Sequence, residues 1–302
     1  MREKQERIAS HQDIWSIWLL HRRDADDPQA QELTSQYLRP IRDRVLDNAA
    51  VGQGEVLLDV GCGEGLIGFG ALERTRVGTV IFSDISQYIL TRCKELAEEL
   101  GLIDRCDFVR APAEDLFPLP DASVSIVTTR SVLIYVQDKA RAFQEFHRVL
   151  APGGRFSLFE PINSFAYPGP DHMFAGFDVT EVEPLARKVK AIYRAAYAAE
   201  DDPMIHFNER DLFRYAEEVG FGELHLHFEA TLEPRGEDAR WDVFLRRAPN
   251  PLAPTLEEAV SEALLPSEGE EFLAHLRPLV EARKGSRKMA VAYFWGKKDG
   301  DG

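Results

Sequence analysis

A short apolar run that ends in three alternating glycines limits the fold of this 302-residue chain more than any other feature. Residues 56–60 predict a buried strand, the sequence DVGCGEG begins at Asp59, and a helix is expected from Leu66. Glycines at alternate positions let the backbone turn tightly and let a ligand approach where no Cβ intervenes. The turn also places N–H groups of a helix N-terminus beside that ligand, where a carboxylate is favoured.

Strand and helix patterns alternate along the middle of the chain. Ser86 and Asp138 are placed to cap two of the intervening helices. Such alternation is typical of a parallel sheet with crossover helices. We therefore predict an α/β fold with a doubly wound, mostly parallel seven-stranded sheet. The expected strands are short apolar runs, at 56–60, 80–82, 106–109, 124–128, 155–159, 224–232 and 290–295.

Two segments interrupt this alternation, and we expect them to form a cap of helical insertions. The insertions span 162–205 and 234–288, within a domain predicted over 51–302. Residues 1–50 predict N-terminal helices that close the ligand pocket. The first insertion carries a cluster that is either a lid packing on an apolar substrate or ordinary core, and its members are Phe165, Tyr167, Met173, Phe174 and Phe177. Helix starts are expected at three capping-box patterns, which begin at Thr180, Thr255 and Ser267.

An aspartate at the end of the second predicted strand completes the site pattern. Asp84 lies about 20 residues after the glycine turn, where a nucleoside ribose binds in a doubly wound sheet. Its two carboxylate oxygens can accept both ribose hydroxyls. A role for Asp84 as a helix cap is the alternative, although Ser86 already supplies a cap. The G-x-G-x-x-G spacing of nicotinamide dinucleotide sites is not met from Gly61, because the sixth position is then Leu66. Counted from Gly63 the sixth position is Gly68 and the second glycine is Gly65, but the first glycine then lies too far into the turn.

Residues 56–160 resemble the core of class I S-adenosylmethionine (SAM)-dependent methyltransferases, especially the small-molecule branch that includes the quinone C-methyltransferases. The resemblance rests on the motif formed by Asp59 and the three glycines of the turn, on Asp84, and on the sequence LAPGG that begins at Leu150. It implies that the glycine turn holds the methionine part of SAM, Asp84 the ribose, and Ile85 and 113–114 the adenine. Pro112 stands where such proteins often carry an aspartate. The implied SAM-binding residues are Asp59, Gly61, Cys62, Gly63, Gly65, Asp84, Ile85, Ala113, Glu114, Arg130 and Ser131.

Candidate catalytic residues are Tyr135, Glu160, His172 and His206. Tyr135 and Glu160 follow the fourth and fifth strands and can orient an acceptor by hydrogen bonding. Both also have structural alternatives: Tyr135 as packing and Glu160 as an ionic partner of an N-terminal arginine. The two histidines flank the first insertion and are the histidines to test as bases. A general base is needed only for an acceptor that must lose a proton.

Charge and composition narrow the class of partner. The formal net charge is −15 and no basic patch is visible, which argues against nucleic acid. No signal peptide or membrane span is expected, and three cysteines without metal-ligand spacing suggest a reducing cytoplasm. His225 and His227 alternate on one strand face, which we interpret as solvated, so no metal is predicted. The expected function is methyl transfer to oxygen, nitrogen or carbon of a small molecule or short peptide. A SAM-binding regulatory or scaffolding protein without activity is the alternative.

Overall fold

The computed structural model describes residues 12–196, 202–235 and 240–300. The chain divides into two compact units. The helical unit comprises three segments, Met1–Gln36, Ala166–Asp202 and Ala230–Met289. The sheet unit comprises the other three, Tyr37–Phe165, Pro203–Glu229 and Ala290–Gly302.

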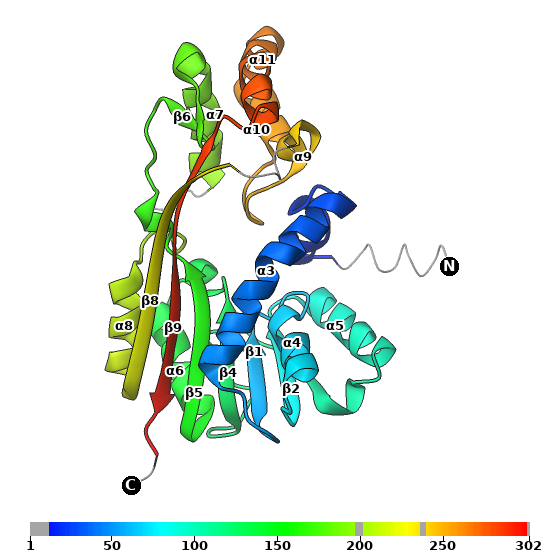
Figure 1. Cartoon of the computed structure of the whole chain (residues 1–302), viewed down its shortest axis with the longest axis vertical. Coiled ribbons are helices and arrows are strands. Elements are labelled where there is room, and N and C mark those ends of the chain that lie inside the picture. The colour runs from blue at the N-terminus through cyan, green and yellow to red at the C-terminus, as the bar shows by residue number, and fades with distance from the viewer. Residues whose placement is uncertain (1–11, 197–201, 236–239, 301–302) are drawn as a thin grey trace. The chain divides into compact units, whose positions relative to one another are not determined.

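The sheet has seven strands in the order β3-β2-β1-β4-β5-β9-β8 (Figure 1). The first five strands in this order run parallel, and β9 pairs antiparallel with β5. This arrangement confirms the predicted α/β fold with a mostly parallel seven-stranded sheet. The first strand has its predicted bounds and the others extend further than their apolar runs. The bounds are β1 Val56–Val60, β2 Thr79–Asp84, β3 Cys106–Arg110, β4 Val124–Arg130, β5 Leu150–Pro161, β8 Phe221–Pro234 and β9 Ser286–Lys298.

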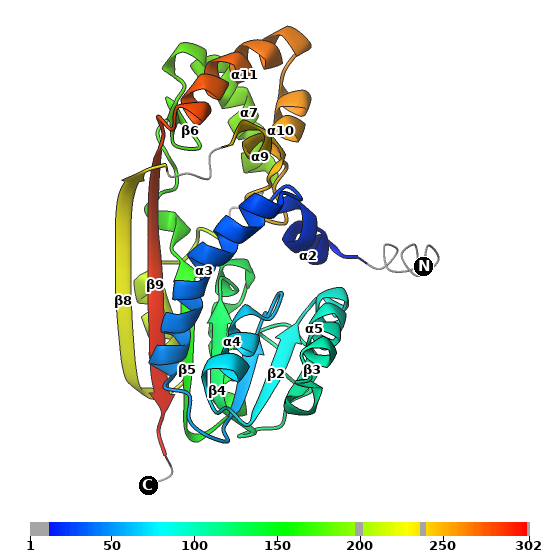
Figure 2. The same cartoon turned by 45° about the vertical axis from the view of Figure 1, so that its right-hand side comes forward.

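Helices cover both faces of this sheet, with α4 and α5 on one face and α6 and α8 on the other (Figures 1 and 2). Side-chain caps begin three of these helices. Ser86 and Asp138 cap α5 and α6 as predicted, with Ser86 Oγ accepting from Ile89 N–H at 3.2 Å, and Asn208 caps α8. A long helix, α3, crosses the boundary between the units. The bounds are α3 Pro28–Ala49, α4 Leu66–Arg74, α5 Gln87–Glu99, α6 Lys139–Val149 and α8 Glu209–Glu218.

A single apolar core lies between the sheet and the α6–α8 layer. Phe143, Phe146 and Phe156 are fully buried there and meet at ring-centroid distances of 5.7 Å from Phe143. Strand β1 is buried almost throughout, because both of its neighbours in the sheet are strands and helices cover its faces. The core therefore fixes the carboxyl ends of β1, β2 and β4, where the predicted site residues lie.

The helical unit has a separate core built from its own helices. Thr255 and Glu258 form the predicted capping box at the start of α10, but the predicted start at Ser267 is wrong. Helix α11 begins one residue earlier, at Pro266, whose fixed φ suits the first helical turn. The bounds are α2 Ile14–Ile17, η1 Trp18–Arg22, β6 Met173–Phe174, β7 Phe177–Asp178, η5 Thr180–Val182, α7 Glu183–Ala196, α9 Trp241–Arg246, α10 Leu256–Ala263 and α11 Pro266–Glu281.

The aromatic cluster predicted as a lid is split between core and surface. Phe174 and Phe177 are buried in the helical unit, and Phe174 packs edge-on against Phe272 at 5.5 Å. For these two residues the core interpretation therefore holds. Phe165 and Tyr167 are exposed, at 40% and 43%.

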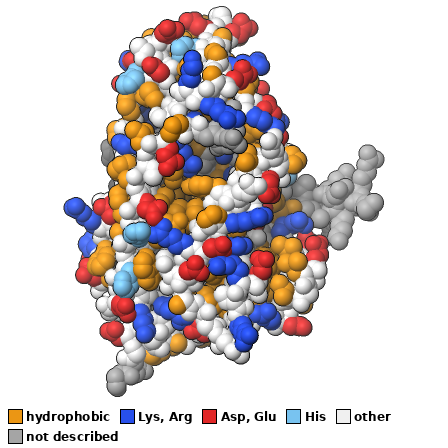
Figure 3. Space-filling view, viewed as in Figure 1, with side chains coloured by type: hydrophobic (Ala, Val, Ile, Leu, Met, Phe, Trp, Pro, Cys, Tyr) orange, Lys and Arg blue, Asp and Glu red, His pale blue; other side chains and the backbone are white. Residues whose placement is uncertain are grey.

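Charged side chains of both signs are interspersed on the face shown in Figure 3. No helix among the described residues is long and apolar enough to cross a membrane. The described histidine, cysteine and acidic side chains form no cluster that could hold a metal ion.

Candidate cofactor site

The turn after β1 depends on the left-handed conformation of its three glycines. The φ angles of Gly61, Gly63 and Gly65 are +61°, +52° and +78°. A side chain at these positions strains the backbone. Neighbouring side chains also occupy the space: a Cβ on Gly61 would lie 2.4 Å from Val132 Cγ2. The glycines therefore serve the shape of the turn itself, beside α4, which starts directly after Gly65.

The buried side chain of Asp59 stabilises this turn by hydrogen bonds. Its side chain is 2% exposed; one oxygen accepts from the Gly68 N–H at 3.0 Å and the other from Thr128 Oγ1 at 3.2 Å. Burial raises the pKa of Asp59 to about 7, against the opposing effect of these hydrogen bonds. The contacts connect β1 to the first turn of α4. Asp59 thus supports the turn from within the protein, and its predicted place in the SAM site stays a prediction.

Asp84 joins the second strand to the glycine turn. Its Oδ2 accepts from the Gly63 N–H at 3.0 Å, and its Oδ1 accepts from the Ser86 N–H at 2.9 Å. Each carboxylate oxygen can accept a further hydrogen bond, so these contacts leave room for ribose hydroxyls. Ser86 Oγ caps α5, so Asp84 is not needed as its side-chain cap.

Two cysteines line the inner side of the same turn. The Sγ atoms of Cys62 and Cys93 lie 3.6 and 3.1 Å from the Gly63 carbonyl oxygen. The backbone N–H of Cys62 donates to the Ser83 carbonyl at 2.9 Å, so its backbone ties the turn to β2. Burial raises the pKa of the Cys62 thiol, which keeps it protonated at neutral pH.

The residues predicted to meet adenine follow β2 and β3. Ile85 is 39% exposed directly after the buried strand β2, an unusual place for a large apolar side chain. The Ala111 N–H donates to the Asp84 carbonyl at 3.2 Å, which brings the segment with Ala113 and Glu114 next to Asp84. Ala113 is buried and Glu114 is half-buried. The geometry thus groups Ile85, Ala113 and Glu114 near the acidic residue.

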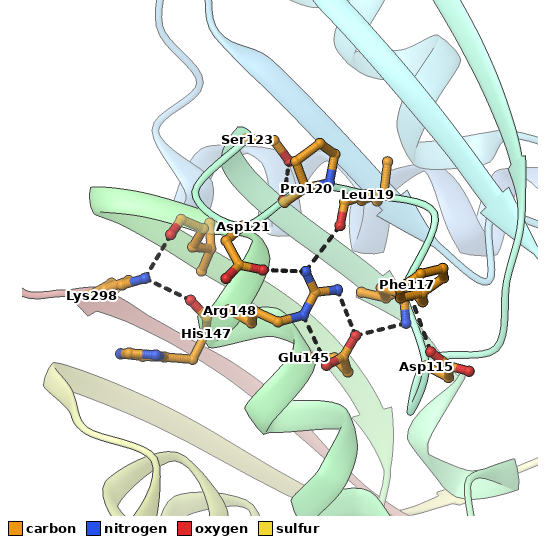
Figure 4. Close-up of polar contacts among 12 residues, drawn as sticks. Asp115, Phe117, Leu119, Pro120, Asp121, Ser123, Glu145, His147, Arg148 and Lys298 are labelled. Carbon is orange, nitrogen blue, oxygen red and sulfur yellow. Dashed lines mark hydrogen bonds and ion pairs between the residues drawn. The ribbon is translucent and has the colours of Figure 1, made fainter.

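Two charged residues of α6 anchor the loop that follows β3, as Figure 4 shows. Glu145 accepts from the Leu116 N–H at 2.8 Å and pairs with Arg148 through two hydrogen bonds of 3.0 and 2.7 Å. Arg148 in turn donates to the Leu119 carbonyl and to Asp121. The Arg148 guanidinium lowers the pKa of Glu145. The loop after β3 is therefore fixed by an ion pair.

The segment after β4 approaches the glycine turn from another strand. Arg130 ends β4, and its charge partly offsets the burial that raises the pKa of Asp59. Ser131 has a φ of +55°, and its N–H donates to the Phe159 carbonyl at 2.8 Å. A short 3-10 helix, η3 Leu133–Tyr135, follows, and Tyr135 is half-buried at its end.

Glu160, predicted as a catalytic candidate, is fully buried at the end of β5. Its carboxylate accepts from the N–H groups of Val132, Leu133 and Ile134 at 2.9, 3.0 and 3.2 Å. The sequence suggested that Glu160 orients an acceptor or pairs with an N-terminal arginine. Its role in binding backbone N–H groups was not predicted. Burial raises the pKa of Glu160 to about 7.

Residues 58–158 match the family described as a methyltransferase domain. The ubiquinone/menaquinone biosynthesis C-methyltransferase UbiE of Escherichia coli is 31% identical over 144 residues, which are 47% of this chain and 55% of that protein. The chain thus spans about half the length of the curated relatives it matches. These matches confirm the predicted resemblance to class I methyltransferases for this domain.

Solved structures of similar fold extend over more of the chain. The [4+2]-cyclase SpnF has a TM-score of 0.53 at 19% identity, covering 88% of this chain and 83% of that one. A geranyl diphosphate methyltransferase in complex with SAM has a TM-score of 0.51 at 19% identity, covering 86% and 85%. These likenesses confirm the fold. The cyclase also illustrates that this fold alone does not decide the reaction.

The histidines predicted as bases lie in different units. His172 is exposed in the helical unit, and His206 is exposed in the sheet unit. The catalytic roles of Tyr135 and His206 in the sheet unit stay predictions, and so does that of His172 in the helical unit.

Sequence reasoning missed three residues that support the methyltransferase domain, Thr128, Lys139 and Glu145. Lys139 carried a usable signal, because a cation in the first turn of a helix opposes the helix dipole and so suggests another role. Glu145 and Thr128 carried none, since their partners are far away in sequence.

Proposed function

We propose that this protein is a SAM-dependent methyltransferase that acts on a small molecule or short peptide. One observation carries the proposal: the Asp84 carboxylate is hydrogen-bonded directly to the Gly63 N–H within the matched methyltransferase domain. That contact supports a site in which Asp84 accepts from ribose hydroxyls beside a glycine turn that leads into a helix N-terminus. Both groups that a nucleoside with an amino-acid tail requires are therefore adjacent.

The residues fit SAM part by part. The turn from Gly61 to Gly65 and the N-terminus of α4 suit the methionine carboxylate. Asp84 has the acceptor capacity for the ribose. The exposed Ile85 suits the face of an adenine ring, and 113–114 lie near its edge. Arg130 and Ser131 extend the set toward the sulfur end.

When bound, SAM supplies a methyl group on a sulfonium, which leaves as part of a good, neutral leaving group. The main task of the chain is then to align an acceptor with that methyl, an effect that can contribute roughly 7–11 kcal/mol. We assign this task to the segment that ends in Tyr135, whose hydroxyl can orient an acceptor atom. The acceptor atom stays open among oxygen, nitrogen and carbon.

Partner class and location form part of the same proposal. The net charge of −15 and the mixed charges in Figure 3 favour a small acceptor over nucleic acid. A cytoplasmic location is supported by Cys62, Cys93 and Cys106, which are all free and buried.

Transfer of label from SAM tests the proposal. The full chain is incubated with SAM carrying a tritiated methyl group and with fractions of a small-molecule cell extract, and Asp84→Ala serves as the control variant. Label that enters a small molecule with the wild type, and much more slowly with Asp84→Ala, supports the proposal. Binding of SAM without transfer to any fraction would favour a regulatory SAM-binding protein instead.

A further inference from the structure

Glu160 binds the beginning of the segment after β4, here called the acceptor segment and defined as residues 131–136. Three consecutive N–H groups, of Val132, Leu133 and Ile134, converge on its two carboxylate oxygens. Thr129 Oγ1 approaches the same carboxylate at 3.4 Å. Helix N-termini leave such N–H groups without partners inside the helix, and η3 begins at Leu133.

Lys139 binds the other end of the acceptor segment. Its ammonium group is buried and donates to the Val136 carbonyl at 2.9 Å. It also donates to the Pro203 carbonyl at 2.9 Å and lies 4.6 Å from the centre of the Phe207 ring. A buried lysine is rare unless its charge is compensated. Its positive charge partly offsets the burial that raises the pKa of Glu160.

The acceptor segment touches the glycine turn directly. Val132 packs so closely on Gly61 that a Cβ there would lie 2.4 Å from Val132 Cγ2. Movement of the segment therefore alters the wall of the turn that is proposed to hold SAM. The other end of the same six residues carries Tyr135.

We infer that Glu160 and Lys139 are positioning residues for methyl transfer, which clamp the acceptor segment at both ends and fix Val132 and Tyr135 relative to the glycine turn. This inference rests on the proposed function. Each acts on the reaction through the segment that it holds. Misplacement by about 1 Å can slow an aligned reaction roughly 100-fold, so a rigid segment has a direct use in such a site.

An ionised carboxylate suits this role better than a neutral amide. A glutamate offers two acceptor oxygens, enough for three N–H donors, whereas a glutamine offers one oxygen and turns an N–H₂ group toward the remaining donors. Glu160→Gln therefore keeps the volume and removes part of the clamp. The same substitution at Glu145 is the matched control, because Glu145 is also a buried glutamate bound to a backbone N–H but anchors the loop after β3.

Hydrogen exchange measured by mass spectrometry tests the clamp itself. In Glu160→Gln the amides within 132–134 that face the new N–H₂ group should exchange at least about tenfold faster, since they lose a hydrogen bond to a carboxylate oxygen. In Glu145→Gln these amides should stay protected, and the amide of Leu116 should exchange faster instead. Unchanged protection of 132–134 in Glu160→Gln would overturn the inference. If Glu160→Gln does not fold, Lys139→Gln replaces it, with faster exchange near Val136 and the following helix turn as the expected result.

Calorimetry with SAM and S-adenosylhomocysteine tests the link to methyl transfer. The two ligands differ only in the methyl group and its positive charge, so the ratio of their dissociation constants reports on the methyl end of the site. Glu160→Gln should change this ratio by at least about threefold, the size of one moderate hydrogen bond. Glu145→Gln should leave the ratio unchanged. An unchanged ratio in Glu160→Gln overturns this inference alone, whereas a wild type that binds neither ligand overturns the proposed function as well.

Discussion

The turns that follow β1 and β4 are both held by buried acidic residues, but the information that shapes them lies in different parts of the chain. The turn after β1 takes its shape from its own glycines at positive φ, supported by Asp59 immediately before it. The acceptor segment after β4 takes its shape from Glu160 on the next strand and Lys139 on the next helix. The first is encoded locally and the second by contacts between distant residues.

The two turns correspond to two tasks of the proposed reaction, binding SAM and aligning the acceptor. A local turn with fixed glycines suits a ligand that does not vary, such as SAM. A segment held by side chains of other elements can change with those side chains, which suits an acceptor end that differs between enzymes. Substitutions in the two turns should therefore have separable effects on SAM affinity and on methyl transfer.

The largest effect is expected for a branched side chain within the first turn. Gly63→Val places a β-branched residue at a φ of +52° and disturbs the N–H that binds Asp84. The dissociation constant for SAM should rise by at least roughly 100-fold. Calorimetry measures the affinity, and circular dichroism checks that the fold survives.

Gly101→Val is the matched control for that change. Gly101 also has a positive φ, of +68°, but lies outside the turn and has no atom within 4 Å of a built Cβ. It should lower stability by a similar strain and leave SAM affinity unchanged. Equal losses of SAM affinity in both variants would remove the special role of the turn.

The second effect concerns the pH dependence of stability. The folded-state pKa of Asp59 is about 7, above its unfolded value, so the folded protein binds more protons than the unfolded chain between about pH 4 and 7. Raising the pH through this range therefore favours unfolding. In Asp59→Asn this contribution is absent. From pH 5 to pH 8 the free energy of unfolding of the wild type, measured with urea, should therefore fall by roughly 2–3 kcal/mol relative to that of the variant.

Glu145→Gln gives the control of opposite sign. The Arg148 guanidinium lowers the folded-state pKa of Glu145, so its stabilisation is present above the unfolded pKa and is lost as the pH falls. This variant should be less stable than the wild type at neutral pH, and the difference in their free energies of unfolding should shrink in acid. If the difference in unfolding free energy between the wild type and Asp59→Asn does not change with pH, the raised pKa of the buried Asp59 is contradicted.

A smaller effect is expected at the strand next to the turn. Asp84→Ala removes a charged acceptor of the Gly63 N–H and of the proposed ribose contact, each worth about 1.5–3 kcal/mol. SAM affinity should fall tenfold or more. Asp107→Ala, an exposed aspartate on the neighbouring strand β3, should leave it unchanged. Equal affinities of the two variants would exclude Asp84 from the site.

The smallest effect on SAM affinity is expected at the second turn. Tyr135→Phe removes only a hydroxyl at the end of the acceptor segment, so the dissociation constant for SAM should stay within about threefold of the wild type. Label transfer to the acceptor should slow. Loss of SAM affinity without any change in transfer would reverse the assignment of the two turns.

The sequence allowed the local turn to be predicted but not its supports. Gly61, Gly63, Gly65 and Asp84 were identified because their spacing follows from backbone geometry at the end of a strand. Glu160 was noticed for its position at the end of β5, yet its backbone partners lie about 26–28 residues earlier in the chain. No short-range pattern encodes such a contact.

The helical unit shows the same limit. Capping-box patterns predicted helix starts there, and the box at Thr255 was correct whereas the start at Ser267 was wrong. Phe174 and Tyr167 were grouped as one lid cluster because they are close in sequence, but one is buried in the unit's core and the other is exposed. Burial depends on which elements pack together, and composition alone does not decide that.

Calorimetric titration of the wild-type chain with SAM, and separately with NAD, tests the central claim most directly. We predict that SAM binds at one site per chain, that NAD does not bind, and that Asp84→Ala weakens SAM binding by at least tenfold. The glycine turn and Asp84 would then form the SAM site together. Binding of NAD without SAM, or SAM binding of equal strength in Asp84→Ala, would contradict the account.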